Sequence, residues 1–447
     1  MLTSKKNTML KNKISILILV FTAVFFTSCE LEDLPNENAP TLESFADGAS
    51  QADVQSLAVG LEAVMRNDLE FHYQTISYIG REYYDLTGTD PRYTGELLKG
   101  PLDNNGFLTT RAYSAWYRVV KAANVLVTAV ENSEAGFSDA TKRSYYGYAN
   151  TIKAYALLMV ANRQFSNGIR VDVADPDNLG PFLGYPEALT AIRNLLNDAN
   201  SDLTNGGGTF DFPISSGYDG FATPATFATF NRALAARVAL YQGNKSDALS
   251  LLGNSFFDIS GALNVGVAHV FGATGNDVLN AQFYVLGQSG QEYMIHNSWI
   301  ADAEAGDTRV ANKSFMLPTP RMFDDLTATH QMALYTSNTD PVYLIRNEEL
   351  ILIYAEANIG TNNAEAVNAI NVIRNAAGLA NYSGATTDAA LELEVLNQRR
   401  YSLIGEGHRW IDLRRTGRLN DVNFLPLDRM GDNALDAFPT PFSENVN

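Results

Sequence analysis

Cysteine is almost absent from this chain, since Cys29 is the only one among 447 residues. No intrachain disulfide can form, so packing must hold the fold together. Histidine is scarce as well, with five scattered residues, and a lone histidine is more often structural than a ligand. The motifs of metalloproteases, phosphate loops and nucleophile elbows are missing. We therefore expect no catalytic residues, no metal and no cofactor.

Positive charge is also in short supply, with 32 Lys and Arg against 50 Asp and Glu and a net charge of −18. Such an excess of negative charge argues against nucleic acid and anionic lipid surfaces as partners. Hydrophobic residues make up 46% of the chain, which is enough to bury a large core. No apolar run is long enough to span a bilayer comfortably.

The first 28 residues have the features of an export signal. Four lysines precede an apolar run over 14–26, and two small residues follow directly before Cys29. We interpret 1–28 as a lipoprotein signal peptide, Cys29 as the acylated residue and 29–44 as a flexible tether. Cleavage removes the four lysines and leaves 28 basic against 50 acidic residues, a net charge of −22.

Helical periodicity dominates the rest of the chain, because apolar residues recur three or four positions apart. We predict helices over 116–130, 145–159, 227–241, 350–357 and 366–377, with weaker patterns over 50–67, 186–204 and 387–404. Three stretches lack this pattern and are rich in Gly, Pro, Asn, Asp and aromatic residues: 71–110, 168–184 and 254–345. We expect irregular insertions there, and such segments usually carry function.

Two neighbouring segments, 237–252 and 352–370, look like copies of one unit. In each, a helical pattern closes at a glycine, Gly243 or Gly360, and a second helical pattern opens a few residues later. Glycine suits the end of a helix because it tolerates positive φ. The form resembles a tetratricopeptide repeat, whose helix pairs stack to bury a continuous core. The pattern predicts a mainly α protein.

An Arg-rich segment over 398–417 carries five arginines interleaved with apolar residues. Guanidinium groups in such a setting indicate partly buried ion pairs with carboxylates. We interpret the segment as a structural brace, and we expect Arg409 and Arg414 to pair with acids such as Glu349 or Glu356. The structural residues of this prediction are Arg399, Arg400, Glu406, His408, Arg409, Trp410, Asp412 and Arg414.

Aromatic residues in two irregular stretches are the candidates for ligand binding. Sugars have flat C–H faces edged with hydroxyls, so Tyr and Trp rings can stack on them while polar neighbours take the hydroxyls. Trp299 is the strongest single candidate, because no helical pattern accounts for its burial. The full set is Tyr83, Tyr84, Arg92 and Tyr93 in the first stretch and Tyr284, Tyr293, Asn297 and Trp299 in the second.

The Arg-rich segment also resembles the C-terminal signature of the SusD/RagB family. The matching residues are Arg399-Arg400, Leu403, Glu406-Gly-His-Arg-Trp410, Asp412-Leu413 and Arg415. Further matches are Tyr354-Ala-Glu-Ala357, Asn371-x-Ile373-Arg374 and Pro439-Thr-Pro441. The resemblance covers the mature chain unevenly and is most specific over 346–418.

The resemblance implies a SusD-like fold over 45–447, in which tetratricopeptide-like helix pairs support insertions that form a ligand face, and 346–447 is its C-terminal helical part. It implies a lipoprotein of the outer membrane that binds a nutrient and delivers it to a SusC-like TonB-dependent barrel. The acids that follow Cys29 resemble a signal for display on the cell exterior.

The identity of the nutrient stays open at this point. Glycan or oligosaccharide is the first expectation, and peptide is the alternative, because some members of the family serve peptide import. A surface glycoside hydrolase is a further alternative, since two carboxylates at the required separation could come from any of the 50 acids. A scaffold for envelope complexes, which would bind protein alone, is the last.

Overall fold

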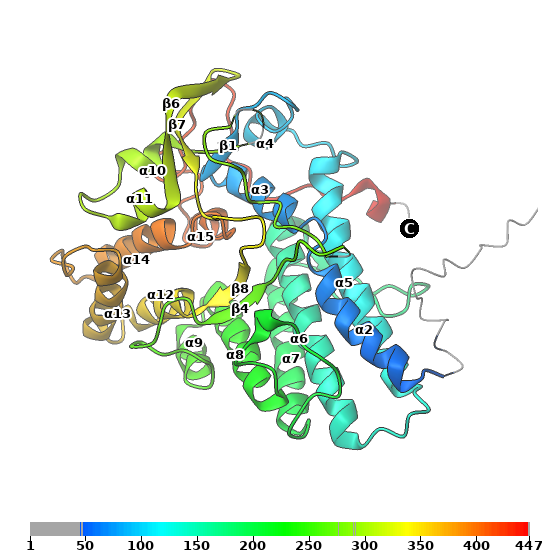
Figure 1. Ribbon diagram of the computed structural model, residues 1–447. Coiled ribbons are helices and arrows are strands. Elements are labelled where there is room, and N and C mark those ends of the chain that lie inside the picture. The colour runs from blue at the N-terminus through cyan, green and yellow to red at the C-terminus, as the bar shows by residue number, and fades with distance from the viewer. Residues whose placement is uncertain (1–44, 46–47, 276, 289, 291, 446–447) are drawn as a thin grey trace, which may run out of the picture. The chain divides into compact units, whose positions relative to one another are not determined.

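The computed structural model describes residues 45, 48–275, 277–288, 290 and 292–445 (Figure 1). Cys29 and the signal peptide and tether predicted from the sequence lie outside the described residues. From Phe45 onward the chain forms one compact unit. Its helices are α2 (Gln51–Val64), α3 (Leu69–Ile79), α4 (Glu96–Lys99), α5 (Phe107–Glu131), α6 (Asp139–Gln164), α7 (Tyr185–Thr204), α8 (Pro224–Tyr241), α9 (Lys245–Leu252), α10 (Asn297–Ala301), α11 (Thr308–Lys313), α12 (Asn347–Asn358), α13 (Asn363–Ala376), α14 (Asp388–Ser402) and α15 (Arg409–Arg415).

The long helices pack in sequence order and form the framework. Helix α2 packs on α5, and each following helix packs on the next through α6, α7, α8 and α9. Helix α12 then joins α9 to the pair α13 and α14. Figure 1 shows α5, α6, α7 and α8 side by side. The structure therefore confirms the predicted mainly α architecture.

The two predicted helix pairs are present, as α8–α9 and α12–α13. Helix α8 begins with a capping box at Thr223 and with Pro224 in its first turn, a position where the missing N–H costs nothing. Each first helix is followed by a glycine with positive φ, +73° at Gly243 and +89° at Gly360. A residue with a Cβ would be strained in that conformation, so glycine sets the turn between the paired helices.

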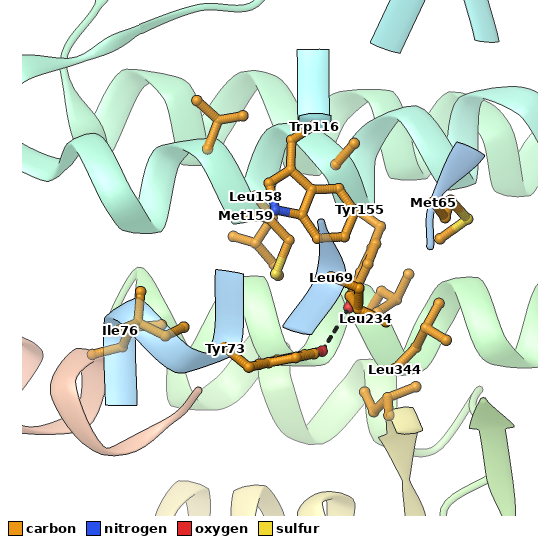
Figure 2. Close-up of a cluster of buried hydrophobic side chains, with 14 of the residues drawn as sticks. Met65, Leu69, Tyr73, Ile76, Trp116, Tyr155, Leu158, Met159, Leu234 and Leu344 are labelled. Atoms are coloured by element: carbon orange, nitrogen blue, oxygen red, sulfur yellow. Dashed lines mark hydrogen bonds between the residues drawn. The ribbon is translucent and has the colours of Figure 1, made fainter. Parts of the chain in front are cut away.

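The main core lies where α3 meets α5, α6 and α8 (Figure 2). Trp116 and Tyr155 pack edge to face with ring centroids 5.6 Å apart. The indole N–H of Trp116 donates to Nδ1 of His72 at 3.0 Å, and the hydroxyls of Tyr73 and Tyr155 lie 3.3 Å apart. Burying each such ring contributes roughly 2–3 kcal/mol, and the polar tips are satisfied inside the core.

The described residues also contain eight strands, most of them short, which form smaller sheets beside this framework. They are β1 (Tyr83–Asp85), β2 (Ile169–Arg170), β3 (Phe182–Leu183), β4 (Gly266–His269), β5 (Tyr293–Ile295), β6 (Ser314–Phe323), β7 (Leu326–Met332) and β8 (Val342–Arg346). The largest sheet is antiparallel with strand order β1-β5-β7-β6, and β4 pairs with β8 next to the start of α12. In Figure 1 the four-stranded sheet lies beside α10 and α11, away from α7 and α8.

The stretch 71–110 begins as a regular helix rather than as an irregular segment. Ten of the eleven residues of α3 are buried, and they include polar side chains such as His72 and Gln74, so the helix has no exposed face and its composition is not that of a surface helix. The strands within 254–345 gave no clear alternation either, because they are short and several are buried on both faces. Among the described residues, no helix is both long and apolar enough to cross a bilayer.

Candidate functional site

Five tyrosines gather where α3 meets the first strands of the largest sheet. Tyr78 on α3 packs edge to face on Tyr83 of β1, with ring centroids 5.5 Å apart. Tyr83 lies against Tyr293 of β5 at 4.9 Å, because antiparallel pairing of β1 with β5 brings the two strands together. All three rings are at most 3% exposed. They form the floor of what we call the tyrosine site.

The outer edge of this site has three partly exposed rings, Tyr93, Tyr284 and Phe107. Tyr93 packs on Tyr78 with ring centroids 5.9 Å apart and meets Phe107 at the same distance. Tyr284 packs edge to face on Tyr293 at 4.7 Å, and its hydroxyl donates to that of Tyr293 at 3.4 Å. The buried floor holds these rings in place, so part of each remains available at the surface.

Carboxylates lie close to the tyrosine hydroxyls at this edge. Burial, together with the negative charge of Asp85, raises the pKa of Tyr93 to about 12. Burial and the charges of Asp85 and Glu70 also raise the pKa of Tyr284, although its hydrogen bond to Tyr293 acts in the opposite direction. Asp85 pairs with Tyr293 in the β1–β5 register, so its carboxylate lies on the face of the sheet that carries Tyr83 and Tyr293. Its Oδ1 accepts from the backbone N–H and hydroxyl of Thr87, at 2.8 and 2.6 Å, and its Oδ2 can still accept from a ligand.

Arginine completes the rim of the site. Arg92 is exposed, is held by Asp90 at 2.6 Å, and places its guanidinium 4.3 Å from the centre of the Phe107 ring. The site thus combines partly exposed rings, carboxylate acceptors and a positioned guanidinium donor. Such a surface can stack on a flat apolar face and bind the hydroxyls around it. Among the described residues, no cluster of acids and histidines is suited to hold a metal.

Trp299 is not exposed, contrary to the expectation from sequence. It lies on the short helix α10 with 1% of its surface accessible, and its ring packs on Tyr401 with centroids 5.0 Å apart. Its indole N–H donates to the carbonyl of Arg400 at 3.2 Å. The partners that bury it come from α14, about a hundred residues further along the chain, so local sequence gave no sign of them. A ring buried in this way cannot stack on a sugar.

Tyr84 and Asn297 lie outside the tyrosine site as well. Successive residues of a strand point to opposite faces, so Tyr84 points away from the side that Tyr83 faces. Tyr84 is 2% exposed and donates to Asp428 at 2.7 Å. Asn297 is exposed but donates to the carbonyl of Thr327 at 2.8 Å, which ties α10 to β7.

The Arg-rich brace consists of the end of α14, the turn after it and all of α15; it is mostly buried and its ion pairs reach α12. Arg399 pairs with Asp412 at 2.6 Å, and the two side chains are 1% and 3% exposed. Arg415 bridges Asp412 at 2.9 Å and Glu356 at 2.7 Å. The remaining residues of the segment are placed as follows: Glu406 accepts from Arg346 at 2.6 Å, Arg400 pairs with Asp302 at 2.9 Å, and the Trp410 indole donates to the Leu435 carbonyl at 2.7 Å.

The expected partners of Arg409 and Arg414 are wrong. Arg409 donates to the carbonyl of Phe424 at 2.9 Å, and Arg414 donates to the carbonyls of Asn162 and Asp436. Both arginines meet backbone oxygens because the end of α6 and the segments around Phe424 and Asp436, and not α12, cover their side of α15. The acid Glu349 instead pairs with Arg237 from α8, at 2.6 Å.

In the brace, ion pairing keeps the Asp412 carboxyl charged, whereas burial keeps the His408 imidazole neutral. Although burial opposes it, the charges of Arg399 and Arg415 lower the pKa of Asp412 to about 2. Burial lowers the pKa of His408 to about 4, although Glu349 lies 3.7 Å from its Nε2. His408 is therefore neutral at neutral pH, while the carboxylate stays charged. This arrangement is that of a structural network with no exposed reactive group.

Sequence reasoning missed several members of the tyrosine site. Phe107 lay in an irregular stretch that was rich in other aromatics, and Glu70 stood just before that stretch. Both residues reach the site because α3 and the start of α5 lie next to each other. The ring centroids of Phe71 and Phe107 are 5.6 Å apart. A search for aromatic residues at helix starts that border irregular segments would have found Phe107.

The fold is that of a mainly helical protein, and the tyrosine site gives it a surface of partly exposed aromatic rings. Residues 241–434 match the sequence model of the SusD family. The resemblance to that family, predicted from the sequence, is therefore confirmed. No protein with a curated description matches this chain in sequence.

Solved structures of SusD-like proteins share the fold. A SusD superfamily protein from Bacteroides vulgatus has a TM-score of 0.67 at 17% identity, over 88% of this chain and 96% of that one. A laminarin-binding SusD-like protein has a TM-score of 0.62 at 18% identity, over 89% and 98%. Surface glycan-binding protein A from Bacteroides thetaiotaomicron, in complex with laminarihexaose, has a TM-score of 0.65 at 14% identity, over 89% and 97%.

Proposed function

We propose that this chain is a cell-surface lipoprotein that binds a glycan at the tyrosine site, without catalysis, for delivery to a TonB-dependent barrel. The observation that carries the proposal is the group of partly exposed rings, Tyr93, Tyr284 and Phe107, on a buried aromatic floor. The SusD family match and two neighbours that bind laminarin or laminarihexaose support glycan as the ligand class.

The site is suited to a sugar more than to a catalytic step. Asp85 pairs with Tyr293 across the β1–β5 register, and Glu70 precedes Phe71, whose ring packs on Phe107; burial raises the pKa of Glu70 although Arg111 lowers it. Arg111 lies 3.6 Å from Glu70 and pairs with Asp68 at 2.6 Å, so this carboxylate is partly neutralised. Hydroxyl groups of a glycan can donate to both acids while a ring face rests on Tyr284.

A glycan array probed with the mature protein tests this function. We expect binding to at least one glycan with modest affinity, because shallow surface sites bury little of their ligand. Incubating the same labelled glycan with excess protein should release no shorter product. Binding to peptides alone would favour the peptide alternative, and product release would overturn the proposal of binding without catalysis.

Anchoring and the barrel partner form the second part of the proposal. Cys29 carries the only thiol in the chain, so it is the only cysteine available for acylation. We expect Cys29→Ala to abolish lipid labelling and recovery with the outer membrane, and the native protein to co-purify with a TonB-dependent barrel in near-equal amount. Normal labelling of the variant would contradict anchoring through Cys29. Recovery of the native protein alone would contradict the barrel.

A further inference from the structure

A second cavity, of about 380 Å³, lies where the end of β8 meets the brace. Its volume falls within the roughly 300–1,000 Å³ typical of small-molecule sites. None of its lining residues belongs to the tyrosine site. We call it the Lys313 pocket, and the side chains that matter here are Lys313, Arg346, Glu348, Glu406, Tyr335 and Tyr343.

The floor of the Lys313 pocket has spare hydrogen-bonding capacity. The Lys313 ammonium donates to the carbonyls of Tyr401 and Ser402, at 3.0 and 2.5 Å, which occupies two of its three N–H groups. Arg346 bridges the carboxylates of Glu348 and Glu406, the latter at 2.6 Å. Each carboxylate can accept about four hydrogen bonds, so both retain free acceptor positions.

The floor is also close to electrical balance. Its two cations face the carboxylates of Glu348 and Glu406, and Asp340, which accepts from the backbone N–H and hydroxyl of Ser337, adds one further negative charge to the lining. Burial lowers the pKa of Lys313 to about 8, while Glu348 and Glu406 act in the opposite direction, so the ammonium is still largely charged at neutral pH. A ligand with net charge would be attracted by some of these side chains and repelled by the others, so its net electrostatic gain in binding would be small. A neutral ligand with both donors and acceptors suits this floor.

The walls of the pocket are aromatic and partly exposed. Tyr335 and Tyr343 are both half-buried lining residues. A polyhydroxylated ring has C–H faces for such walls and hydroxyls that can donate to Glu406 and accept from Lys313. We propose that the Lys313 pocket binds one sugar ring of a neutral glycan, as a second subsite. This proposal rests on glycan binding as the proposed function.

One chain segment connects the pocket with the tyrosine site. The Gln282 amide donates to the hydroxyl of Tyr335 at 3.4 Å, and two residues later the Tyr284 hydroxyl donates to Tyr293. The segment 282–284 therefore borders both sites. A glycan of several units that occupies both gains affinity, because its second contact is intramolecular once the first has formed.

Crystals of the mature protein soaked in turn with glucose, galactose, mannose and glycylglycine test the pocket directly. We expect at least one of the three sugars within hydrogen-bond distance of Lys313 Nζ and the Glu406 carboxylate. Glycylglycine serves as the zwitterionic control. A pocket that stays empty in all three sugar soaks, or that takes only the dipeptide, overturns the proposal.

Affinity in solution separates a true subsite from binding at crystal concentration only. Asn264 is an exposed lining residue, so Asn264→Trp should fill the pocket without touching its charged floor. We expect this variant to bind laminarihexaose, or the neutral glycan that binds best on the array, at least ~10-fold more weakly, a change of about 1.4 kcal/mol. Asn375→Trp, at an exposed position on α13, is the matched control and should bind like the wild type.

The failures of the two proposals can be told apart. If Asn264→Trp binds like the wild type while Tyr284→Ala does not bind, the pocket is not a subsite and the proposed function stands. If the wild type binds no glycan in solution, the proposed function fails, and a sugar found in the soaked pocket would then be bound at crystal concentration only, which also overturns the subsite.

Discussion

Arg399 in the brace and Tyr284 in the tyrosine site differ in burial and in how far along the chain their neighbours lie. Arg399 is 2% exposed and meets its partner Asp412 thirteen residues away in sequence. Tyr284 is partly exposed, and Tyr93, which shares its site, lies 191 residues earlier in the chain. The brace is a mostly buried, charged network whose central ion pair, Arg399 with Asp412, is local in sequence. The site is a surface assembled from distant segments and left open on one side.

The difference predicts that the two regions respond to mutation in opposite ways. Removing one partner of a buried ion pair leaves an unpaired charge in a dry environment, which affects folding. Removing a partly exposed ring takes away contact area for a ligand and leaves the framework intact. Stability and ligand binding should therefore be separable by choosing the region that is changed.

Arg399→Ala should produce the largest effect on stability. It leaves the Asp412 carboxylate, 2% exposed, with Arg415 as its remaining partner, and breaking such a pair typically costs about 3–5 kcal/mol. Urea unfolding at neutral pH measures the free energy of unfolding. Molecules that remain folded at low temperature should still bind glycan. A variant with normal stability that fails to bind would mean that the brace belongs to the ligand site.

Glu82 connects the two regions and should give a smaller, pH-dependent effect. It accepts from Ser77 next to Tyr78, at 2.8 Å, and from the Gly405 N–H of the brace, at 3.3 Å. Burial raises its pKa from 4.5 to about 7. The folded state therefore holds a proton that the unfolded state releases, so stability falls as pH rises from 4.5 to 7, and the full penalty is present above 7.

Glu82→Gln should remove this penalty. We expect the variant to exceed the wild type above pH 7 by at most about 3 kcal/mol, at 1.36 kcal/mol per pKa unit, and to lose the advantage as pH falls toward 4.5. Thermal unfolding across this pH range measures the difference. Equal stability of the two proteins at pH 8 would show that the Glu82 carboxylate is not penalised by burial.

The framework could be predicted from sequence because its signals are local. Helices that cover the core on one face have apolar residues at regular spacing, and Gly243 and Gly360 mark the ends of paired helices. Helix α3 was not predicted, because it is buried on every side and mixes polar with apolar residues instead of presenting one exposed polar face. The partners of Arg409 and Arg414 could not be predicted, because contacts with backbone carbonyls of distant segments leave no trace in the pattern of side chains.

For the candidate site, the sequence predicted the stretches of chain that contribute but not which of their aromatic rings are exposed. Both irregular stretches contribute to it, and Tyr93 and Tyr284 are among the residues that sequence singled out. Which rings are exposed depends on strand pairing and on helix contacts far along the chain. Tyr83 and Tyr84 show this directly, since one step along β1 separates the site floor from the Asp428 contact. Trp299 shows it again through its burial against α14.

Calorimetric titration of the Tyr93→Ala/Tyr284→Ala double variant with the glycan that binds best on the array tests the central claim most directly. Each ring contributes about 0.5–1.5 kcal/mol beyond its buried area. We therefore expect affinity to fall at least ~10-fold while the unfolding transition shifts little. Tyr146→Ala, a partly exposed ring on α6, is the control and should bind like the wild type. Unchanged affinity in the double variant would contradict the tyrosine site as the place where this protein binds its ligand.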